Sequence, residues 1–126
     1  MARSQLRANR KASGGKYKNT NSKKKTELAR NPTMTRLSEK QKIKTMRVLG
    51  GNNKNLILSG NQINVANKKG EIKKTVITNV VENEANPHMV RRNILTKGAI
   101  VETSLGKAKI TSRPGQQASL SGTLVE

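Results

Sequence analysis

The sequence contains no cysteine, and it has one histidine and one aromatic side chain, Tyr17. Without cysteine there is no disulfide scaffold, no thiolate nucleophile and no cysteine-ligated zinc. The single histidine, His88, leaves too few groups to assemble a nucleophile, a base and an orienting group, so we expect no enzyme activity. A metal would need carboxylates alone, and the nearest pair, Glu82 and Glu84, is more typical of local salt bridges. We therefore expect neither a metal nor a cofactor.

Long apolar runs are also missing. The longest run has three residues, as at Leu56 to Leu58, which is too short for a membrane span or a signal-peptide core. The chain is therefore expected in the cytoplasm, with no membrane partner. The lysines of Gly14-Gly15-Lys16 and Gly106-Lys107 lack the second glycine of a phosphate-binding loop. Neither nucleotide hydrolysis nor another small-molecule substrate is expected.

Positive charge is what the chain has in excess. Its 26 lysines and arginines outnumber 7 acidic residues, which gives a formal charge of +19 on 126 residues. Self-repulsion of this size opposes compaction unless a polyanion is bound, and nucleic acid is the strongest candidate. Because only 32% of the residues are apolar, the core must be small, and bound RNA should supply part of the stability.

The charge is concentrated near the N-terminus. Residues 1–49 hold 15 of the basic side chains and 2 of the acidic ones, and residues 1–25 show almost no apolar periodicity. Such a segment cannot offset its ordering entropy, so we expect residues 1–32 to be a disordered basic extension that orders on RNA. Thr26 to Arg30 could add one helical turn, ended by Asn31-Pro32.

Cationic side chains recur every few residues along this extension, at a spacing that suits a phosphate backbone. Gly14-Gly15 would let the main chain approach RNA closely. With Tyr17 as the sole aromatic, shape and backbone readout should dominate over base stacking. A solubilising tail or a localisation signal is the alternative explanation. The predicted RNA-binding residues of the extension are Arg3, Arg7, Arg10, Lys11, Lys16, Lys18, Lys23, Lys24, Lys25 and Arg30.

Beyond Pro32 the sequence changes to short β-branched runs separated by Gly, Asn and Pro, which is typical of all-β chains. Residues 33–126 are therefore predicted to form one domain of roughly seven or eight short strands. A closed barrel or a small sandwich would fit, and we favour the barrel because it leaves few open sheet edges. Strands are expected at Met34–Leu37, Ile43–Leu49, Asn55–Ser59 and Leu120–Val125.

The clearest hairpin joins Ala99–Thr103 to Lys107–Thr111. Its connection is Ser104-Leu105-Gly106, in which Gly106 can take the positive φ of a three-residue loop. These features predict two neighbouring antiparallel strands.

A second hairpin is predicted to join Gln62–Ala66 to Glu71–Thr78 through Asn67-Lys68-Lys69-Gly70. A type II turn is expected at Arg113-Pro114-Gly115-Gln116, with proline presetting φ and Gly115 at positive φ. That turn would end the last strand of the first hairpin.

Several stretches resemble one family. The stretches VVENEANPHMVRRN, from Val80 to Asn93, and LTKGAIVET, from Leu95 to Thr103, closely resemble the small-subunit ribosomal protein family S-eight-e. Further matches follow the family's order along the chain: RKASGGK from Arg10, ELAR from Glu27, RVLGGN from Arg47 and TSRPGQ from Thr111. The sequence departs from the family's pattern at Ser13, Ala29, Leu49 and Met89.

The resemblance implies a β-barrel body and an N-terminal extension that runs into small-subunit ribosomal RNA, in a structural constituent of the ribosome. The short length resembles the archaeal form, since eukaryotic members carry an insertion that this chain lacks. His88 could bond a phosphate or a 2′-hydroxyl, or be an ordinary surface imidazole. The expected RNA-binding residues of the body are Arg47, Lys54, His88, Arg91, Arg92, Lys97 and Arg113.

The expected partners are small-subunit ribosomal RNA and neighbouring ribosomal proteins. Two alternatives stay open. One is a ribosome-assembly factor that binds precursor RNA transiently, and the other is a DNA-compacting basic protein, which the net charge alone favours.

Overall fold

The computed structural model describes residues 8–18, 22, 24 and 30–125. The chain divides into two units between Pro32 and Thr33. Of the expected helical turn, residues 26–29 lie outside the described residues. Within the described ranges, no helix has the length and apolar character needed to cross a membrane.

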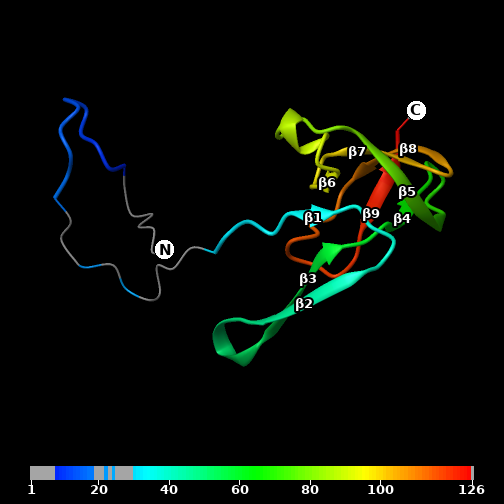
Figure 1. Cartoon of the computed structure of the whole chain (residues 1–126), viewed down its shortest axis with the longest axis horizontal. Helices are drawn as coiled ribbons and strands as arrows, with labels where there is room; N and C mark the ends of the chain where they lie inside the picture. The colour runs from blue at the N-terminus through cyan, green and yellow to red at the C-terminus, as the bar shows by residue number, and fades with distance from the viewer. Residues whose placement is uncertain (1–7, 19–21, 23, 25–29, 126) are drawn as a thin grey trace. The chain divides into compact units, whose positions relative to one another are not determined.

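Residues 33–125 form short strands and two 3₁₀ helices, η2 and η3 (Figure 1). The all-β prediction is therefore confirmed. In chain order the elements are β1 (Thr35–Arg36), β2 (Lys42–Arg47), η2 (Leu49–Gly51), β3 (Asn53–Ser59), β4 (Gln62–Ala66), β5 (Ile72–Glu82), η3 (Pro87–Met89), β6 (Ile94–Leu95), β7 (Ile100–Thr103), β8 (Gly106–Ile110) and β9 (Ser121–Leu124).

Five strands close into a barrel, in the order β4-β5-β7-β8-β9, which confirms the barrel over the sandwich. Each successive pair is antiparallel, so the first and the fifth strand run in the same direction. Closure must then be parallel, and β4 pairs with β9 in this sense, with Val65 opposite Gly122. Register shifts in β5 where it pairs with β7 are the kind of irregularity that bends a long strand around a barrel.

The barrel core is mainly aliphatic, and Thr75 of β5 and Thr103 of β7 are buried with it. Alternation along β4 buries Ile63 and Val65 and leaves Gln62 and Asn64 exposed. Short side chains such as Ala99 and Ala108 are fully buried as well, because a narrow barrel leaves little room inside. The core cluster comprises Ile57, Ile63, Val65, Ile77, Val80, Leu95, Ala99, Val101, Ala108, Ile110 and Leu120.

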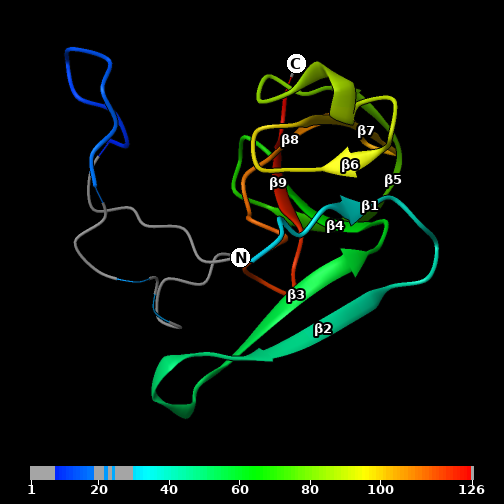
Figure 2. The same ribbon diagram turned by 60° about the vertical axis from the view of Figure 1, so that its left-hand side comes forward.

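A second sheet, in the order β2-β3-β1-β6, stands beside the barrel. Thr35 of β1 is fully buried, and its Oγ1 donates to the carbonyl of Ile57 at 2.6 Å. Both residues of β6, Ile94 and Leu95, are buried. The strands β2 and β3 pair from Lys42 opposite Ser59 to Arg47 opposite Asn53 and extend away from the barrel (Figure 2).

The expected strand Gln62–Ala66 is β4 itself, and most other boundaries differ by one or two residues. Two expectations about strands were wrong. β5 runs to Glu82, four residues beyond the expected end, and β6 was not expected at all. The body is also more than one barrel, because β1, β2, β3 and β6 belong to the separate sheet.

Two turns differ in detail from expectation. Gly106 has positive φ (121°), but it pairs with Thr103 as the first residue of β8, so the connecting loop has two residues rather than three. The amide of Gln116 donates to the carbonyl of Arg113 at 2.9 Å, which confirms a turn there. Gly115 is not at positive φ, so the type II assignment was wrong.

Gly122 in β9 lies where the backbone of β8 comes closest. A Cβ there would meet the carbonyl oxygen of Lys109 at 2.8 Å and Cδ1 of Ile63 at 3.1 Å. We expect Gly122→Ala to lower the free energy of unfolding by about 1–3 kcal/mol, because the added methyl would displace backbone and a buried side chain. Urea unfolding of the full chain measures the change.

The control is Gly60→Ala, since a Cβ at Gly60 meets no atom closer than 3.6 Å. Equal stability of the two variants would contradict the tight β8–β9 contact.

Candidate nucleic-acid interface

Residues 9–17 form a small hairpin around the diglycine. The amide of Gly14 donates to the carbonyl of Lys11 at 2.9 Å, and the amide of Lys11 donates to that of Gly15 at 2.8 Å. Gly14 has a φ of 84°, the left-handed residue that such a loop needs. Arg10 pairs with Lys16 across the hairpin, and its Nη1 donates to the Gly14 carbonyl at 3.0 Å. The glycines therefore shape a turn between cationic residues.

The extension residues that the structure describes carry exposed cations. Nζ of Lys11 lies 5.6 Å from the ring centroid of Tyr17, within cation–π range. Their role on RNA and the order of the segment without RNA stay predictions. Described are Arg10, Lys11, Lys16, Lys18, Lys24 and Arg30, whereas Arg3, Arg7, Lys23 and Lys25 lie outside the described residues.

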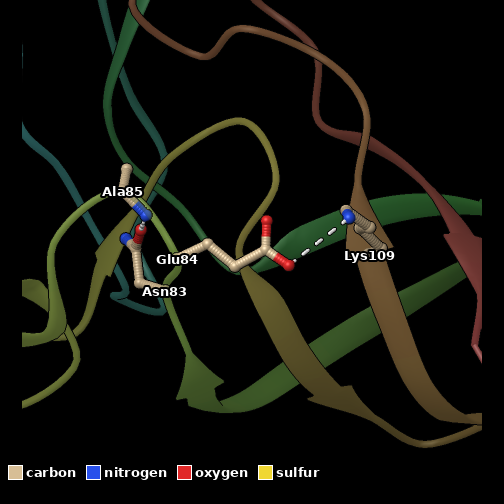
Figure 3. A network of polar contacts seen from close by, with 4 residues as sticks. All are labelled: Asn83, Glu84, Ala85 and Lys109. Carbon is tan, nitrogen blue, oxygen red and sulfur yellow. Dashed lines mark hydrogen bonds and ion pairs between the residues drawn. The ribbon is translucent and has the colours of Figure 1, made fainter.

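In the body, one buried amide organises the loop after β5. Asn83 is 3% exposed, and its Nδ2 donates to Oγ1 of Thr96 at 2.8 Å. Its Oδ1 accepts from the amide of Ala85 at 3.1 Å, as Figure 3 shows, and from that of Asn86 at 3.4 Å. One side chain therefore ties together the two ends of a loop, residues 83–96, which contains three of the seven positions predicted in the body.

The middle of this loop brings His88 and Arg91 together. Pro87 begins η3, and the side chain of Asn86 caps it by accepting from the amide of His88 at 2.9 Å. Nη2 of Arg91 lies 3.2 Å from Nδ1 of His88. A guanidinium can only donate, so Nδ1 must accept, and His88 helps to orient Arg91. Arg92 is exposed next to it.

The remaining predicted positions fall into two places. Lys97 lies in a tight turn in which the amide of Ala99 donates to the carbonyl of Thr96 at 3.2 Å, close to the loop of His88. Lys54 of β3 donates through Nζ to Oε1 of Gln116, whose turn also contains Arg113. The predicted positions of the body thus form a loop group (His88, Arg91, Arg92 and Lys97) and a hairpin group (Arg47, Lys54 and Arg113).

The acidic residues contribute locally. Oε1 of Glu84 lies 3.9 Å from Nζ of Lys109 (Figure 3); the Glu84 side chain is largely exposed and that of Lys109 about half exposed. The local salt bridge expected of this region is confirmed for Glu84. Among the described residues, no three His, Cys, Asp or Glu side chains cluster as a metal site would require.

Sequence reasoning did not select three exposed cations, Arg36, Lys42 and Lys44, which lie on β1 and β2 beside the predicted positions. A signal was present in the sequence. Residues 40–70 contain seven lysines and arginines and no acidic residue, so any strand formed there carries uncompensated charge.

The fold and the surface define a class: a very basic β-barrel protein that exposes cations on a loop and on a hairpin. A family model described as "Ribosomal protein S8e" matches residues 4–125. The chain is 50% identical over 122 residues to "Small ribosomal subunit protein eS8" of Methanococcus aeolicus, covering 96% of this chain and 95% of that protein. It is 45% identical over 126 residues to the protein of the same name from Methanobrevibacter smithii, covering 99% and 100%.

The chain therefore belongs to the Ribosomal protein S8e family, and the resemblance noted in the sequence is confirmed. This is a family of ribosomal proteins and not of enzymes. The matched relatives are archaeal and close to this chain in length, which agrees with the archaeal form expected from its length.

The geometry of Asn83 predicts a local effect of its removal. We expect Asn83→Ala to destabilise the protein by about 1–3 kcal/mol, because Thr96 and the amides of Ala85 and Asn86 lose hydrogen bonds to a buried side chain. Hydrogen exchange at the amides of residues 83–96 should accelerate more than exchange in the barrel strands.

Asn79→Ala serves as the control, since the side chain of exposed Asn79 accepts from the adjacent amide of Val80, at 2.9 Å. Unchanged protection of residues 83–96 in the Asn83 variant would show that the loop does not depend on this side chain.

Proposed function

We propose that the chain is a structural constituent of the small ribosomal subunit, and that its basic extension and basic loops bind ribosomal RNA. The near full-length match to proteins named as small-subunit components carries this proposal. The protein then works in the cytoplasm, within the ribosome. Its net charge of +19 supports RNA as the direct partner.

The proposed action is electrostatic. Folded RNA brings phosphates of different helices close together, and their repulsion opposes compact packing. Lysine and arginine side chains between such helices lower that repulsion and release condensed counterions. In the loop group, His88 holds one side of the Arg91 guanidinium at 3.2 Å, which leaves further N–H groups to bond a phosphate oxygen.

The proposed function predicts that RNA affinity depends steeply on salt concentration. If about 8–12 cations contact phosphates, log affinity for a folded small-subunit RNA fragment should fall with log salt at a slope of roughly −6 to −11. Filter binding over a series of salt concentrations measures this slope. A slope shallower than about −2 would speak against the proposal.

The proposed function also predicts that charge reversal in the loop group weakens RNA binding. Arg91→Glu combined with Arg92→Glu should weaken RNA binding and lower the slope by about 1.4–1.8, because two phosphate contacts are lost. In a competition assay with the unchanged chain, the variant should be under-represented in assembled subunits. Lys107→Glu with Lys109→Glu applies the same charge change on β8, near Glu84 and Glu102, and is the control. Equal incorporation of the Arg91 and Arg92 variant would remove these residues from the interface.

Assembled particles also separate this function from that of an assembly factor. A structural constituent is present at one copy in mature small subunits after a high-salt wash, as sedimentation and protein staining would show. Presence in precursor particles alone would identify an assembly factor instead.

A further inference from the structure

The hairpin formed by β2 and β3, called here the β2–β3 ribbon (residues 42–59), is covered only at its base. Leu56 and Ile57, at 4% and 1% exposure, are buried there on opposite faces. Farther out, Thr45 and Arg47 of β2 and Asn53 and Asn55 of β3 are exposed. A two-stranded ribbon without a covering layer is marginally stable in water. These four side chains lie on one face of the distal half. On the other face Lys44 is exposed, whereas Met46 and Lys54 are half-buried.

Cross-strand partners point to the same face, so the pairing assigns each side chain to a face. Lys44 lies opposite Leu56, and Met46 lies opposite Lys54. We call this side the lysine face. Arg47 lies opposite Asn53, and Thr45 lies opposite Asn55, with Thr45 Oγ1 donating to Asn55 Oδ1 at 2.9 Å. This second side is the arginine face, and both faces carry positive charge.

The charge of the ribbon is not compensated within its own sequence, because residues 40–70 contain no acidic residue. Lys54 donates to the neutral amide of Gln116, which leaves its charge in place. Apart from Ile43 and Ile57 near the base, the other side chains of the arginine face are amides and a hydroxyl, which bond phosphate and ribose oxygens. A surface that is cationic on two sides is complementary to a polyanion on two sides.

The tip of the ribbon is narrow. Gly50 and Gly51 have φ values of 74° and 76°, and the amide of Val48 donates to the carbonyl of Asn52 at 2.7 Å to close the turn. Leu49 is 95% exposed, an unfavourable state for an aliphatic side chain in water. Contact with the carbon atoms of a base or a ribose would remove it from water.

We propose that the β2–β3 ribbon inserts between two segments of ribosomal RNA, with the lysine face against one, the arginine face against the other, and Leu49 in contact with RNA at the tip. This inference rests on the proposed function and adds the mode of contact. It differs from surface binding, in which one face of a sheet lies on RNA and the other stays in solvent.

Cysteine-directed crosslinking tests the two faces separately. Because the sequence has no cysteine, Lys44→Cys and Thr45→Cys each give a unique thiol, on opposite faces. Each variant, labelled with a photocrosslinker, is assembled into small subunits, and the crosslinked nucleotides are mapped. We expect crosslinks to ribosomal RNA from both positions, at two separate segments. Lys107→Cys on β8 is the control for labelling. RNA crosslinks from one face alone, or from neither, would overturn insertion.

Charge removal gives an independent measurement. Lys44→Gln with Lys54→Gln should lower the salt slope by about 1.4–1.8, and Arg47→Gln alone by about 0.7–0.9, one phosphate contact for each cation. Lys107→Gln with Lys109→Gln is the matched two-charge control and should leave the slope nearly unchanged. If the unchanged chain binds with a steep slope and the ribbon variants keep that slope, insertion is overturned and RNA binding stands. If the unchanged chain itself does not bind, the proposed function fails first.

Discussion

Mutual repulsion of cationic side chains is the constraint that the rest of this structure must satisfy. A formal charge of +19 works against compaction, while the core that opposes it contains neither phenylalanine nor tryptophan. The closed barrel stabilises the body against this repulsion through its strand pairing and packing. Ring closure through β4 and β9 pairs the strands on both sides and removes open edges, and small aliphatic side chains fill the narrow interior. The interior of the barrel is thus mainly apolar, and the predicted RNA-binding cations of the body lie on its loops and on the second sheet.

Three acidic residues lie on or next to the barrel strands. Glu82 and Glu84 follow each other at the end of β5, and Glu102 of β7 lies opposite Lys107 of β8. Glu84 in turn lies near Lys109. Local compensation of this kind lowers the repulsion on one side of the barrel. The positive electrostatic potential of the loop group and of the β2–β3 ribbon is not neutralised in this way. Such a potential attracts and orients a polyanion.

The sequence alone predicted those features that depend on residues close together in the chain. The strand Gln62–Ala66 and its turn were predictable because alternation and a glycine at positive φ are encoded within a few residues. β6 was not, since Ile94 and Leu95 become a strand only by pairing with β1, far away in the sequence. The same holds for the site. The abundance of cations could be counted in the sequence, whereas the separation of Lys44 and Arg47 onto opposite faces depends on the register of β2 against β3.

The order of the second sheet places β1 at its centre, between β3 and β6. Arg36 of β1 lies opposite Ile94 of β6 on one side and Ser59 of β3 on the other. The loop of residues 83–96 includes β6, and the ribbon ends in β3, so the two residues of β1 lie between this loop and the ribbon. The buried bond from Thr35 Oγ1 to the Ile57 carbonyl holds this connection at 2.6 Å. A fixed connection keeps the spacing of the loop and the ribbon constant, and RNA segments bound to both would be held at a constant spacing as well. Bracing of RNA by this protein would then depend on the rigidity of the sheet as much as on its charge.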